Sequence, residues 1–356
     1  MRILITGICG FVGSTLAIEL IKAGQGVEVF GMDNLSRPGS ELNRQTLKKH
    51  GIRLVHGDIR SVSDLGSLPS FQWIIDAAAN PSVLAGVDNR TSSLQLTEHN
   101  LIGTINLLEL SKKRDCGFTM ISTSRVYSLR ALTNLPLEIK EKSFIPRFRE
   151  ISELGLSGAG ISETFSTSHP VSLYGASKLA SEVLALEYGA AFNLPVYINR
   201  CGVLAGAGQF GRPDQGIVSF WIHSYCRKKP LKYIGFGATG YQVRDCLHPR
   251  DLVPLLWKQI QSSGNHAGVV LNLGGGMGSS FSLAQLSDWC AQRFGQHTIA
   301  TDPDDRQFDV PWLVMDSSRA DSLWNWQPTT RLEQIFSEIT DHAEANPLWL
   351  DWSQEA

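Results

Sequence analysis

The stretch Arg2-Ile3-Leu4-Ile5-Thr6-Gly7-Ile8-Cys9-Gly10-Phe11-Val12-Gly13 opens the chain and decides the fold. Its first five residues predict a short buried parallel strand, and residues 14–22 have the apolar spacing of a helix. The three glycines between them allow a tight turn, admit a pyrophosphate to the backbone and let the helix pack closely on the strand. Because a helix N-terminus attracts phosphates, the stretch predicts a dinucleotide-binding turn.

Apolar strands and helices alternate through the first 200 residues. Strands are expected at 27–32, 54–55, 73–75, 117–121 and 195–199, and helices at 100–112 and 174–188. This alternation predicts a doubly wound parallel sheet. Residues 129–170 interrupt it with three prolines and a Gly/Ser-rich run. Because long loops without periodicity are often functional, we expect this segment to be irregular and to form a lid or wall over the substrate.

Two carboxylates follow expected strands on the nucleotide side. Asp33 comes twenty residues after Gly13, where a carboxylate suits the adenosine ribose hydroxyls and repels a 2′-phosphate. This favours NAD over NADP, although Arg37 nearby keeps NADP open. Asp58 is a candidate acceptor for the adenine amino group or, equally, a turn- or helix-capping aspartate. The small residues 77–79 would let the backbone lie against the cofactor.

Tyr174 and Lys178 lie four residues apart at the start of an expected helix, and so one turn apart on one face. An ammonium beside a phenol favours the phenolate and lowers the tyrosine pKa. Such a phenol can take a proton from a sugar hydroxyl and return it. The same pattern also describes an ordinary amphipathic helix. The hydroxyl cluster Ser122-Thr123-Ser124 ends a strand at the edge where open α/β sheets bind ligands.

Composition narrows the class of protein. The 356 residues carry a net charge of -2, with 42% hydrophobic and 19% charged residues, which gives no general attraction to nucleic acid or anionic membranes. Six scattered cysteines without a CxxC motif indicate neither zinc nor a disulfide framework, but reduced thiols. No long uninterrupted apolar run or signal-peptide pattern is present. We therefore expect a cytoplasmic protein without a metal, nucleic-acid or membrane partner.

Taken together, the motifs resemble the extended short-chain dehydrogenase/reductase family, specifically its nucleotide-sugar epimerases. The resemblance rests, in order, on Thr6-Gly7-x-x-Gly10-Phe11-x-Gly13, Asp33-Asn34, Ser122-Thr123 before Val126-Tyr127, and Tyr174-x-x-x-Lys178. Further likeness is carried by Arg200 with Gly206, Arg244-Asp245 with His248, Asn272-Leu273-Gly274 and Arg306.

Within the family, the chain is most similar to the subgroup of CDP-tyvelose 2-epimerases, also called CDP-paratose 2-epimerases. This likeness rests on Asp33-Asn34-Leu35-Ser36-Arg37, the enlarged loop from Tyr127 to Tyr174, Gly208-Gln209-Phe210 with Asp214-Gln215-Gly216, and Gln242-Val243-Arg244-Asp245.

The resemblance implies a role for each matching residue. Tyr174 is the catalytic acid and base, Lys178 lowers its pKa and holds the nicotinamide ribose, and Thr123 hydrogen-bonds the reacting hydroxyl. The residues implied to bind NAD are Gly7, Gly10, Phe11, Gly13, Asp33, Asn34, Ser36, Arg37, Asp58, Ile59, Ala77, Ala78, Ala79, Asn100, Tyr174 and Lys178. Those implied to bind substrate are Thr123, Gln209, Gln215, Val218, Arg244 and Arg306. The two arginines match diphosphate-binding positions, and a structural ion pair is the alternative for each.

The resemblance also implies the architecture. A Rossmann-type NAD-binding region would comprise residues 1–200 and about 240–272, and a smaller C-terminal α/β region, 201–239 and 273–356, would bind the nucleotide sugar. The family further implies a homodimer or tetramer, formed through the helices that carry Tyr174 and Asn100.

The implied activity is NAD-dependent epimerisation of a nucleotide-diphosphate sugar through a transient keto intermediate, at C2 of a CDP-sugar. A UDP-sugar 4-epimerase and a catalytically silent NAD-binding scaffold are the alternatives.

Four departures from the family pattern stand out. Asp76 replaces a usual histidine after the fourth strand. Ser124-Arg125 stands where 4,6-dehydratases carry an Asp-Glu pair that expels the C6 hydroxyl as water, so dehydration is disfavoured. Ser128 and Ala205 replace a usual glycine and tyrosine on the substrate side, which leaves the identity of the sugar open.

Overall fold

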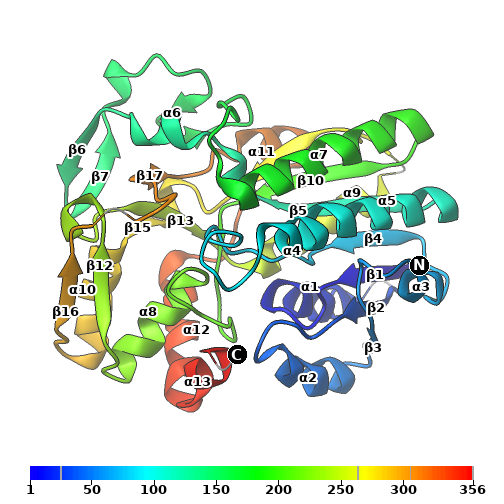
Figure 1. The fold of residues 1–356 in the computed structure, drawn as a ribbon, viewed down its shortest axis with the longest axis horizontal. Helices are drawn as coiled ribbons and strands as arrows, with labels where there is room; N and C mark the ends of the chain where they lie inside the picture. The colour runs from blue at the N-terminus through cyan, green and yellow to red at the C-terminus, as the bar shows by residue number, and fades with distance from the viewer. Residues whose placement is uncertain (25, 263, 305, 355–356) are drawn as a thin grey trace.

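A seven-stranded parallel sheet organises the chain (Figure 1). The computed structural model describes residues 1–24, 26–262, 264–304 and 306–354. The strand order is β14-β10-β5-β4-β1-β2-β3, and every neighbouring pair is parallel. The predicted doubly wound sheet is therefore confirmed. Its strands are β1 (Arg2–Thr6), β2 (Glu28–Asp33), β3 (Arg53–His56), β4 (Trp73–Asp76), β5 (Gly117–Thr123), β10 (Val196–Cys201) and β14 (Val270–Leu273).

Helices cover both faces of the sheet because alternate strand residues point to opposite sides. Ile3 and Ile5 pack in a core with one set of helices, whereas Leu4 packs in a second core on the other face. The first set is α1 (Phe11–Lys22), α2 (Asn43–Lys49), α9 (Leu252–Gln261) and α11 (Ser318–Trp324). The second is α3 (Val62–Gly66), α5 (Gly103–Arg114) and α7 (Ser172–Phe192). A short helix α4 (Ser93–Thr97) and the π-helical turn η2 (Glu98–Ile102) lead into α5.

A smaller sheet lies beyond β10. It contains β11 (Val203–Leu204), β13 (Val243–Leu247), β15 (Ser280–Ser282) and β17 (Trp312–Leu313), and a separate pair joins β12 (Leu231–Ile234) to β16 (Ile299–Asp302). Its helices are α8 (Ile217–Cys226), α10 (Leu283–Phe294), α12 (Leu332–Ala345) and α13 (Trp349–Gln354). Trp221, Leu286 and Ile335 lie in its core. β13, which we expected beside the large sheet, pairs in this smaller sheet, whereas α9 and β14 join the large one.

The segment 129–170 is more regular than predicted. It contains α6 (Leu129–Thr133), a hairpin of β6 (Leu137–Lys140) and β7 (Ser143–Pro146), and a second small pair of β8 (Leu156–Ser157) and β9 (Gly160–Ile161). Its side chains Leu132, Ile161 and Phe165 share a core with Trp312 and Val314. The segment is therefore packed against the C-terminal half of the chain.

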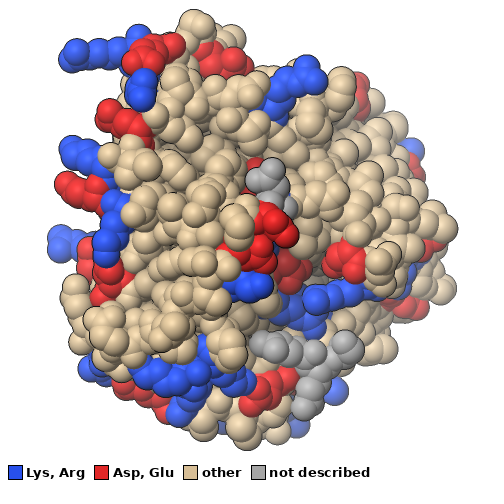
Figure 2. All heavy atoms as spheres, turned by 60° about the vertical axis from the view of Figure 1, so that its left-hand side comes forward, with Lys and Arg blue, Asp and Glu red and all other residues tan. Residues whose placement is uncertain are grey.

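Single 3-10 turns complete the fold: η1 (Ser40–Leu42), η3 (Ser124–Val126), η4 (Phe148–Glu150), η5 (Phe236–Ala238), η6 (Pro249–Asp251) and η7 (Met277–Ser279). On the face in Figure 2, acidic and basic side chains lie beside one another, in keeping with the net charge of -2. Among the described helices, none has both the length and the apolar character needed to cross a membrane.

Candidate active site

A cavity of about 630 Å³ runs along the carboxyl ends of the parallel strands and reaches the smaller sheet. Residues that end or follow β1, β2, β4, β5 and β10 form one wall, and residues of the C-terminal half form the other. The predicted site residues that line it are Gly7, Gly10, Phe11, Gly13, Asp33, Asn34, Ser36, Arg37, Ile59, Ala77, Ala78, Ala79, Thr123, Tyr174, Lys178, Gln209, Gln215, Arg244 and Arg306. Residues that are 300 positions apart in sequence thus share one cavity.

The glycine turn forms the floor of the nucleotide end. Gly7 has a φ of 62°, a conformation that side chains disfavour. A Cβ atom at Gly13 would lie 2.2 Å from the Gly7 carbonyl oxygen, so α1 could not begin where it does with a larger residue there. Because these positions carry no side chains, the space above the glycine turn is open. It fits the pyrophosphate of a dinucleotide at the start of α1.

Asp33 ties this turn to β2. Its carboxylate accepts hydrogen bonds from the backbone N–H of Cys9 (2.8 Å) and of Leu35 (2.8 Å). Burial raises the pKa of Asp33, and the backbone N–H groups of Leu35, Cys9 and Gly10 oppose that rise. The carboxylate is thus held at the cavity wall, where two ribose hydroxyls would meet it.

Asp58 lies beside the cavity but does not line it. Its carboxylate accepts hydrogen bonds from Arg60 Nη2 (2.7 Å) and Asn34 Nδ2 (2.9 Å). The hydrogen bond from Arg60, followed by that from Asn34, holds the pKa of Asp58 well below its usual range. The side chain therefore braces the loops at the adenosine end, and the following residue, Ile59, faces the cavity.

Asp76, where the family usually has histidine, is fully buried and hydrogen-bonded. Its carboxylate accepts from Thr6 Oγ1 (2.7 Å) and Thr104 Oγ1 (3.2 Å), and Thr6 Oγ1 in turn accepts from the Ala78 N–H (3.2 Å). The aspartate thus fixes the segment of small residues that lines the cavity. Its negative charge, with that of Glu182, also opposes the fall that burial causes in the pKa of Lys178.

Asn100 acts from behind the cavity wall. Its Oδ1 accepts from the Asn80 N–H (2.8 Å), and its Nδ2 donates to the Asn80 carbonyl (3.1 Å) and to Ser177 Oγ (3.2 Å). Asn100 therefore links the segment after β4 to α7, and Asn80 rather than Asn100 lines the cavity.

The three predicted catalytic residues meet at the end of β5 and the start of α7. Thr123, Tyr174 and Lys178 all line the cavity. Tyr174 and Lys178 are 6% and 2% exposed, so both heads are removed from bulk water. Thr123 also begins the turn η3, where its Oγ1 accepts from the Arg125 N–H (3.1 Å).

Burial dominates the pKa of both Tyr174 and Lys178 in the protein alone, and the lowering of the tyrosine pKa by Lys178 stays a prediction. Burial raises the pKa of Tyr174 to about 12, and the opposing groups are Thr123 and Arg125 rather than Lys178. Burial also lowers the pKa of Lys178. The physical reason is desolvation, which disfavours the charged form of both groups.

Arginines line the opposite end of the cavity. Arg244 Nη2 donates to Asp309 Oδ1 (2.8 Å), and Arg306 Nη2 donates to the Pro213 carbonyl (2.9 Å). Gln242 Nε2 bonds both Asp309 Oδ2 (3.2 Å) and the Ile234 carbonyl (2.9 Å). Asp309 thus fixes the guanidinium of Arg244 and the amide of Gln242, and the arginines at this end suit a diphosphate.

Glutamines add unsatisfied acceptors to the same wall. The Oε1 atoms of Gln209, Gln215 and Gln242 are buried without a hydrogen-bond partner among the described residues. Gln209 Nε2 donates to the Leu204 carbonyl (2.8 Å), which fixes the direction of its amide. A buried acceptor without a partner is costly, so these oxygens are suited to substrate N–H or O–H donors.

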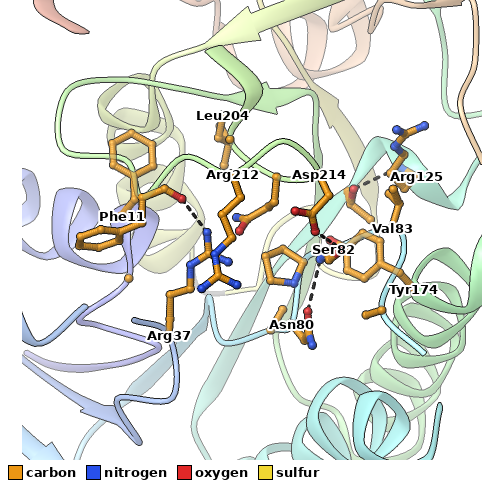
Figure 3. Close-up of a pocket in the computed structure, with 18 of the residues that line it drawn as sticks. Phe11, Arg37, Asn80, Ser82, Val83, Arg125, Tyr174, Leu204, Arg212 and Asp214 are labelled. Atoms are coloured by element: carbon orange, nitrogen blue, oxygen red, sulfur yellow. Dashed lines mark hydrogen bonds between the residues drawn. The ribbon is translucent and has the colours of Figure 1, made fainter. Parts of the chain in front are cut away.

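A loop from the C-terminal half crosses the nucleotide end of the cavity (Figure 3). Arg37 Nη2 donates to the Phe210 carbonyl (2.6 Å), and Ser82 Oγ donates to Asp214 Oδ2 (2.6 Å). The guanidinium groups of Arg37 and Arg212 lie beside one another. Burial, followed by repulsion from Arg212, lowers the pKa of Arg37 to about 10. These cross-links hold the two walls together.

The helix α13 supports this loop from outside. The Trp349 ring stacks on Phe210 with centroids 5.0 Å apart, and its Nε1 donates to the Gln209 carbonyl (3.0 Å). Arg212 Nε donates to the Ser353 carbonyl (2.7 Å). Sequence reasoning missed Arg212 and Ser82, because no local pattern marks a contact between segments this far apart.

Two predictions about the substrate wall are wrong. Val218 is fully buried in the core around Trp221, because it lies on the inner side of α8, and it does not line the cavity. No residue of 129–170 lines the cavity either. The hydrophobic side chains of that segment are committed to the core with Trp312. Arg125, which precedes it, does line the cavity and was overlooked as a site residue.

Candidate metal ligands do not gather in the described residues: no group of three His, Cys, Asp or Glu side chains could hold an ion there. The thiols of the six cysteines are unpaired, and Cys226 alone among them is not fully buried.

Comparison with known proteins places these features in context. A model of the NAD dependent epimerase/dehydratase family matches residues 3–274. The chain is 29% identical to a CDP-paratose 2-epimerase of Salmonella typhi, over 96% of this chain and 98% of the relative. It is 26% identical to a UDP-glucuronate 4-epimerase of Thermodesulfobacterium geofontis, with 96% of each chain covered. The structure of a UDP-glucuronic acid 4-epimerase from Bacillus cereus is similar in fold, with a TM-score of 0.78, 24% identity, and 97% and 99% of the two chains covered.

Proposed function

The chain belongs to the NAD-dependent epimerase/dehydratase family, and from that membership we propose that it epimerises C2 of a CDP-linked sugar. As a member it uses NAD and is related throughout its length to nucleotide-sugar epimerases. The observation that carries the proposal is the meeting, in one cavity, of the glycine turn and Asp33 with Thr123, Tyr174 and Lys178 and with the arginines of the C-terminal half.

The nucleotide end of the cavity fits NAD. The open cradle at Gly7 and Gly13 would hold the pyrophosphate, and the carboxylate of Asp33 would bind the adenosine ribose. Lys178 holds the nicotinamide ribose, with Asp76 and Glu182 favouring its charged form. When bound, NAD supplies a hydride acceptor that becomes the hydride donor in the return step.

Tyr174 moves the proton. Its Oη takes the proton from the reacting hydroxyl and gives it back after the keto-sugar has presented its other face. Thr123 and Arg125 favour its anionic form against the burial that raises its pKa, and bound NAD would add the positive charge of its nicotinamide. Thr123 orients the same hydroxyl. No residue pair matches the acid and base of a dehydratase, since Ser124 and Arg125 follow Thr123.

The substrate end selects a nucleotide diphosphate. Arg244 and Arg306 bind the two phosphates, and the unpaired oxygens of Gln209 and Gln215 accept donors from the sugar or base. CDP is favoured by full-length similarity to the CDP-paratose 2-epimerase together with the Asp214-Gln215-Gly216 and Gln242–Asp245 motifs.

The decisive experiment supplies the NAD-loaded enzyme with CDP-paratose and follows the C2 proton by NMR. Formation of CDP-tyvelose without net change in NAD is the expected result. A protein that holds no NAD, or that leaves CDP-paratose unchanged while inverting a UDP-sugar, would contradict the proposal.

A UDP-sugar 4-epimerase is the second candidate, because UDP-glucuronate 4-epimerases match the chain over a similar length. The two candidates are separated by the shift in Tm that CDP and UDP produce, since a ligand stabilises the fold by RT ln(1 + [L]/Kd). Greater stabilisation by UDP favours this alternative. Stabilisation by NAD but by neither nucleotide would instead favour a silent scaffold.

Two further assignments accompany the proposal. Residues 1–200 with α9 and β14 carry the NAD site, and the remainder carries the nucleotide-sugar site. The subunits associate through α7 and the helix that follows Asn100. In support, Leu173 and Val183 on α7 are 44% and 53% exposed. Size-exclusion chromatography of Val183→Glu tests the interface, and a dimeric variant would contradict it.

A further inference from the structure

Arg125 has a backbone that is fixed next to the catalytic tyrosine. Its N–H donates to Thr123 Oγ1 (3.1 Å). On the other side, a Cβ atom at Gly175 would lie 2.3 Å from the Arg125 carbonyl oxygen, so the turn η3 and the start of α7 are in direct contact. The side chain of Arg125 therefore starts from a defined place, between Thr123 and the helix of Tyr174.

The guanidinium group of Arg125 lines the cavity without a carboxylate partner. Its Nη1 donates to the Phe308 carbonyl at 3.4 Å, a weak hydrogen bond. No ion pair joins it to any of the described acidic side chains. In Figure 3 the group extends away from the Tyr174 ring. Its Nη1 faces the carbonyl of Phe308, the residue that precedes Asp309.

The charges around this group are unbalanced. Arg125 and Arg244 are each influenced electrostatically by Arg306 and by Asp309, and Asp245 also acts on Arg244. Asp309 is already bonded to Arg244 and Gln242. Burial and repulsion from Arg244 lower the pKa of Arg125 to about 10, which still leaves it charged at neutral pH. Among the described residues that line the cavity, Lys and Arg outnumber Asp, so this region is suited to an anion.

We propose that Arg125 binds the β-phosphate, the phosphate that carries the sugar, and so sets the distance between the diphosphate and the hydroxyl at Tyr174. This inference rests on the proposed function. In a nucleotide-diphosphate sugar the β-phosphate is attached through oxygen to C1, so the C2 hydroxyl is its neighbour and the C4 hydroxyl lies across the ring. A cation whose backbone lies between Thr123 and the helix of Tyr174 holds the β-phosphate near the proton-transfer site, which favours the neighbouring C2 hydroxyl. Arg125 thereby selects C2 as the reacting centre.

Nucleotide binding tests the proposal independently of turnover. Calorimetry of the NAD-loaded protein would compare CMP with CDP, and UMP with UDP, for the wild type, Arg125→Gln and Arg125→Lys. We expect Arg125→Gln to weaken diphosphate binding about 10- to 100-fold, the effect of losing a charge-assisted hydrogen bond, and to leave monophosphate binding unchanged. Arg125→Lys should restore part of the loss. Arg130→Gln, an exposed arginine on α6 that does not line the cavity, is the matched control.

Three results would overturn the proposal. Equal weakening of mono- and diphosphates would mean that Arg125 acts on the nucleoside end or on the fold. Unchanged diphosphate binding by Arg125→Gln, with a raised KM for the nucleotide sugar, would place Arg125 on the sugar. Both leave the proposed function intact. If the wild type binds neither CDP nor UDP, the proposed function fails, and the role of Arg125 fails with it.

Discussion

Glu182 and Arg200 form a buried ion pair that joins the helix of the catalytic tyrosine to the centre of the sheet. Arg200 Nη2 and Nε donate to Glu182 Oε2 at 2.7 and 3.0 Å, and both residues are less than a tenth exposed. Ser122 Oγ, at the end of β5, donates to the other carboxylate oxygen. The pair therefore connects α7, β10 and β5 directly behind Thr123 and Tyr174.

Removing one charge of this pair should destabilise the fold. Glu182→Gln leaves the Arg200 guanidinium buried without its counter-charge, and we expect a loss of about 3 kcal/mol in the free energy of unfolding. Urea unfolding measures it. Glu187→Gln, on an exposed position of the same helix, should change stability by less than about 0.5 kcal/mol. Equal effects of the two substitutions would show that the pair adds no specific stability.

Loss of the phenol should separate catalysis from cofactor binding. Tyr174→Phe removes the proton carrier but keeps the ring, so kcat should fall by about 10²- to 10⁴-fold while NAD per subunit stays the same. Tyr188→Phe, on the same helix and outside the cavity, should retain full turnover. Undiminished turnover by Tyr174→Phe would show that another group carries the proton.

Asp245 makes stability depend on pH. This fully buried carboxyl accepts from the Gly276 N–H (3.1 Å), but its Oδ1 has no partner among the described residues. Burial raises its pKa to about 7. The folded state favours the protonated carboxyl, so Asp245 stabilises the fold at acid pH. This stability is lost as the pH rises from the ordinary pKa of an aspartate to about 7.

Asp245→Asn should therefore gain stability relative to the wild type as pH rises from 4 to 7, by up to about 1.4 kcal/mol per pH unit. Urea unfolding at a series of pH values provides the measurement. Asp341→Asn, at an exposed position, should show no such trend. A difference between Asp245→Asn and wild type that stays constant from pH 4 to 8 would contradict a raised pKa at this site.

The stacking of Trp349 on Phe210 should slow the escape of NAD. Trp349→Ala removes the aromatic contact and the hydrogen bond to Gln209, which support the loop tied to Arg37. We expect release about tenfold faster, from roughly 1.4 kcal/mol of lost contacts. Fluorescence after rapid dilution measures the rate. Leu348→Ala beside the same helix, where the side chain is 54% exposed, is the control, and equal rates in the two variants would exclude a specific brace.

The sequence predicted those parts of the site that depend on local geometry. The glycine turn follows β1, and Asp33 and Thr123 are the last residues of β2 and β5. The carboxyl ends of parallel strands all lie at one edge of a doubly wound sheet. Tyr174 and Lys178 followed from helical spacing. These residues reach the cavity because neighbouring chain positions and sheet order determine where they lie.

What sequence reasoning missed depends on contacts between distant segments or on burial. The strands of 129–170 are two to four residues long, too short for a clear period, and their packing on Trp312 is not visible locally. Val218 belongs to a helix whose inner face was not identified. The raised pKa of Tyr174 arises from desolvation, which no spacing of residues encodes.

The last helix, α13, and the loop at residues 207–216 depend on one another structurally, so a substitution of one affects the other. Trp349 and Ser353 contact that loop, and the loop in turn reaches Arg37 and Ser82 on the opposite wall. A chimaera that imports only 201–239 from a relative, in order to change its sugar, would combine a foreign loop with a native brace. Substrate specificity in this fold therefore depends on both the loop and the last helix. Engineering it requires that both segments be exchanged together.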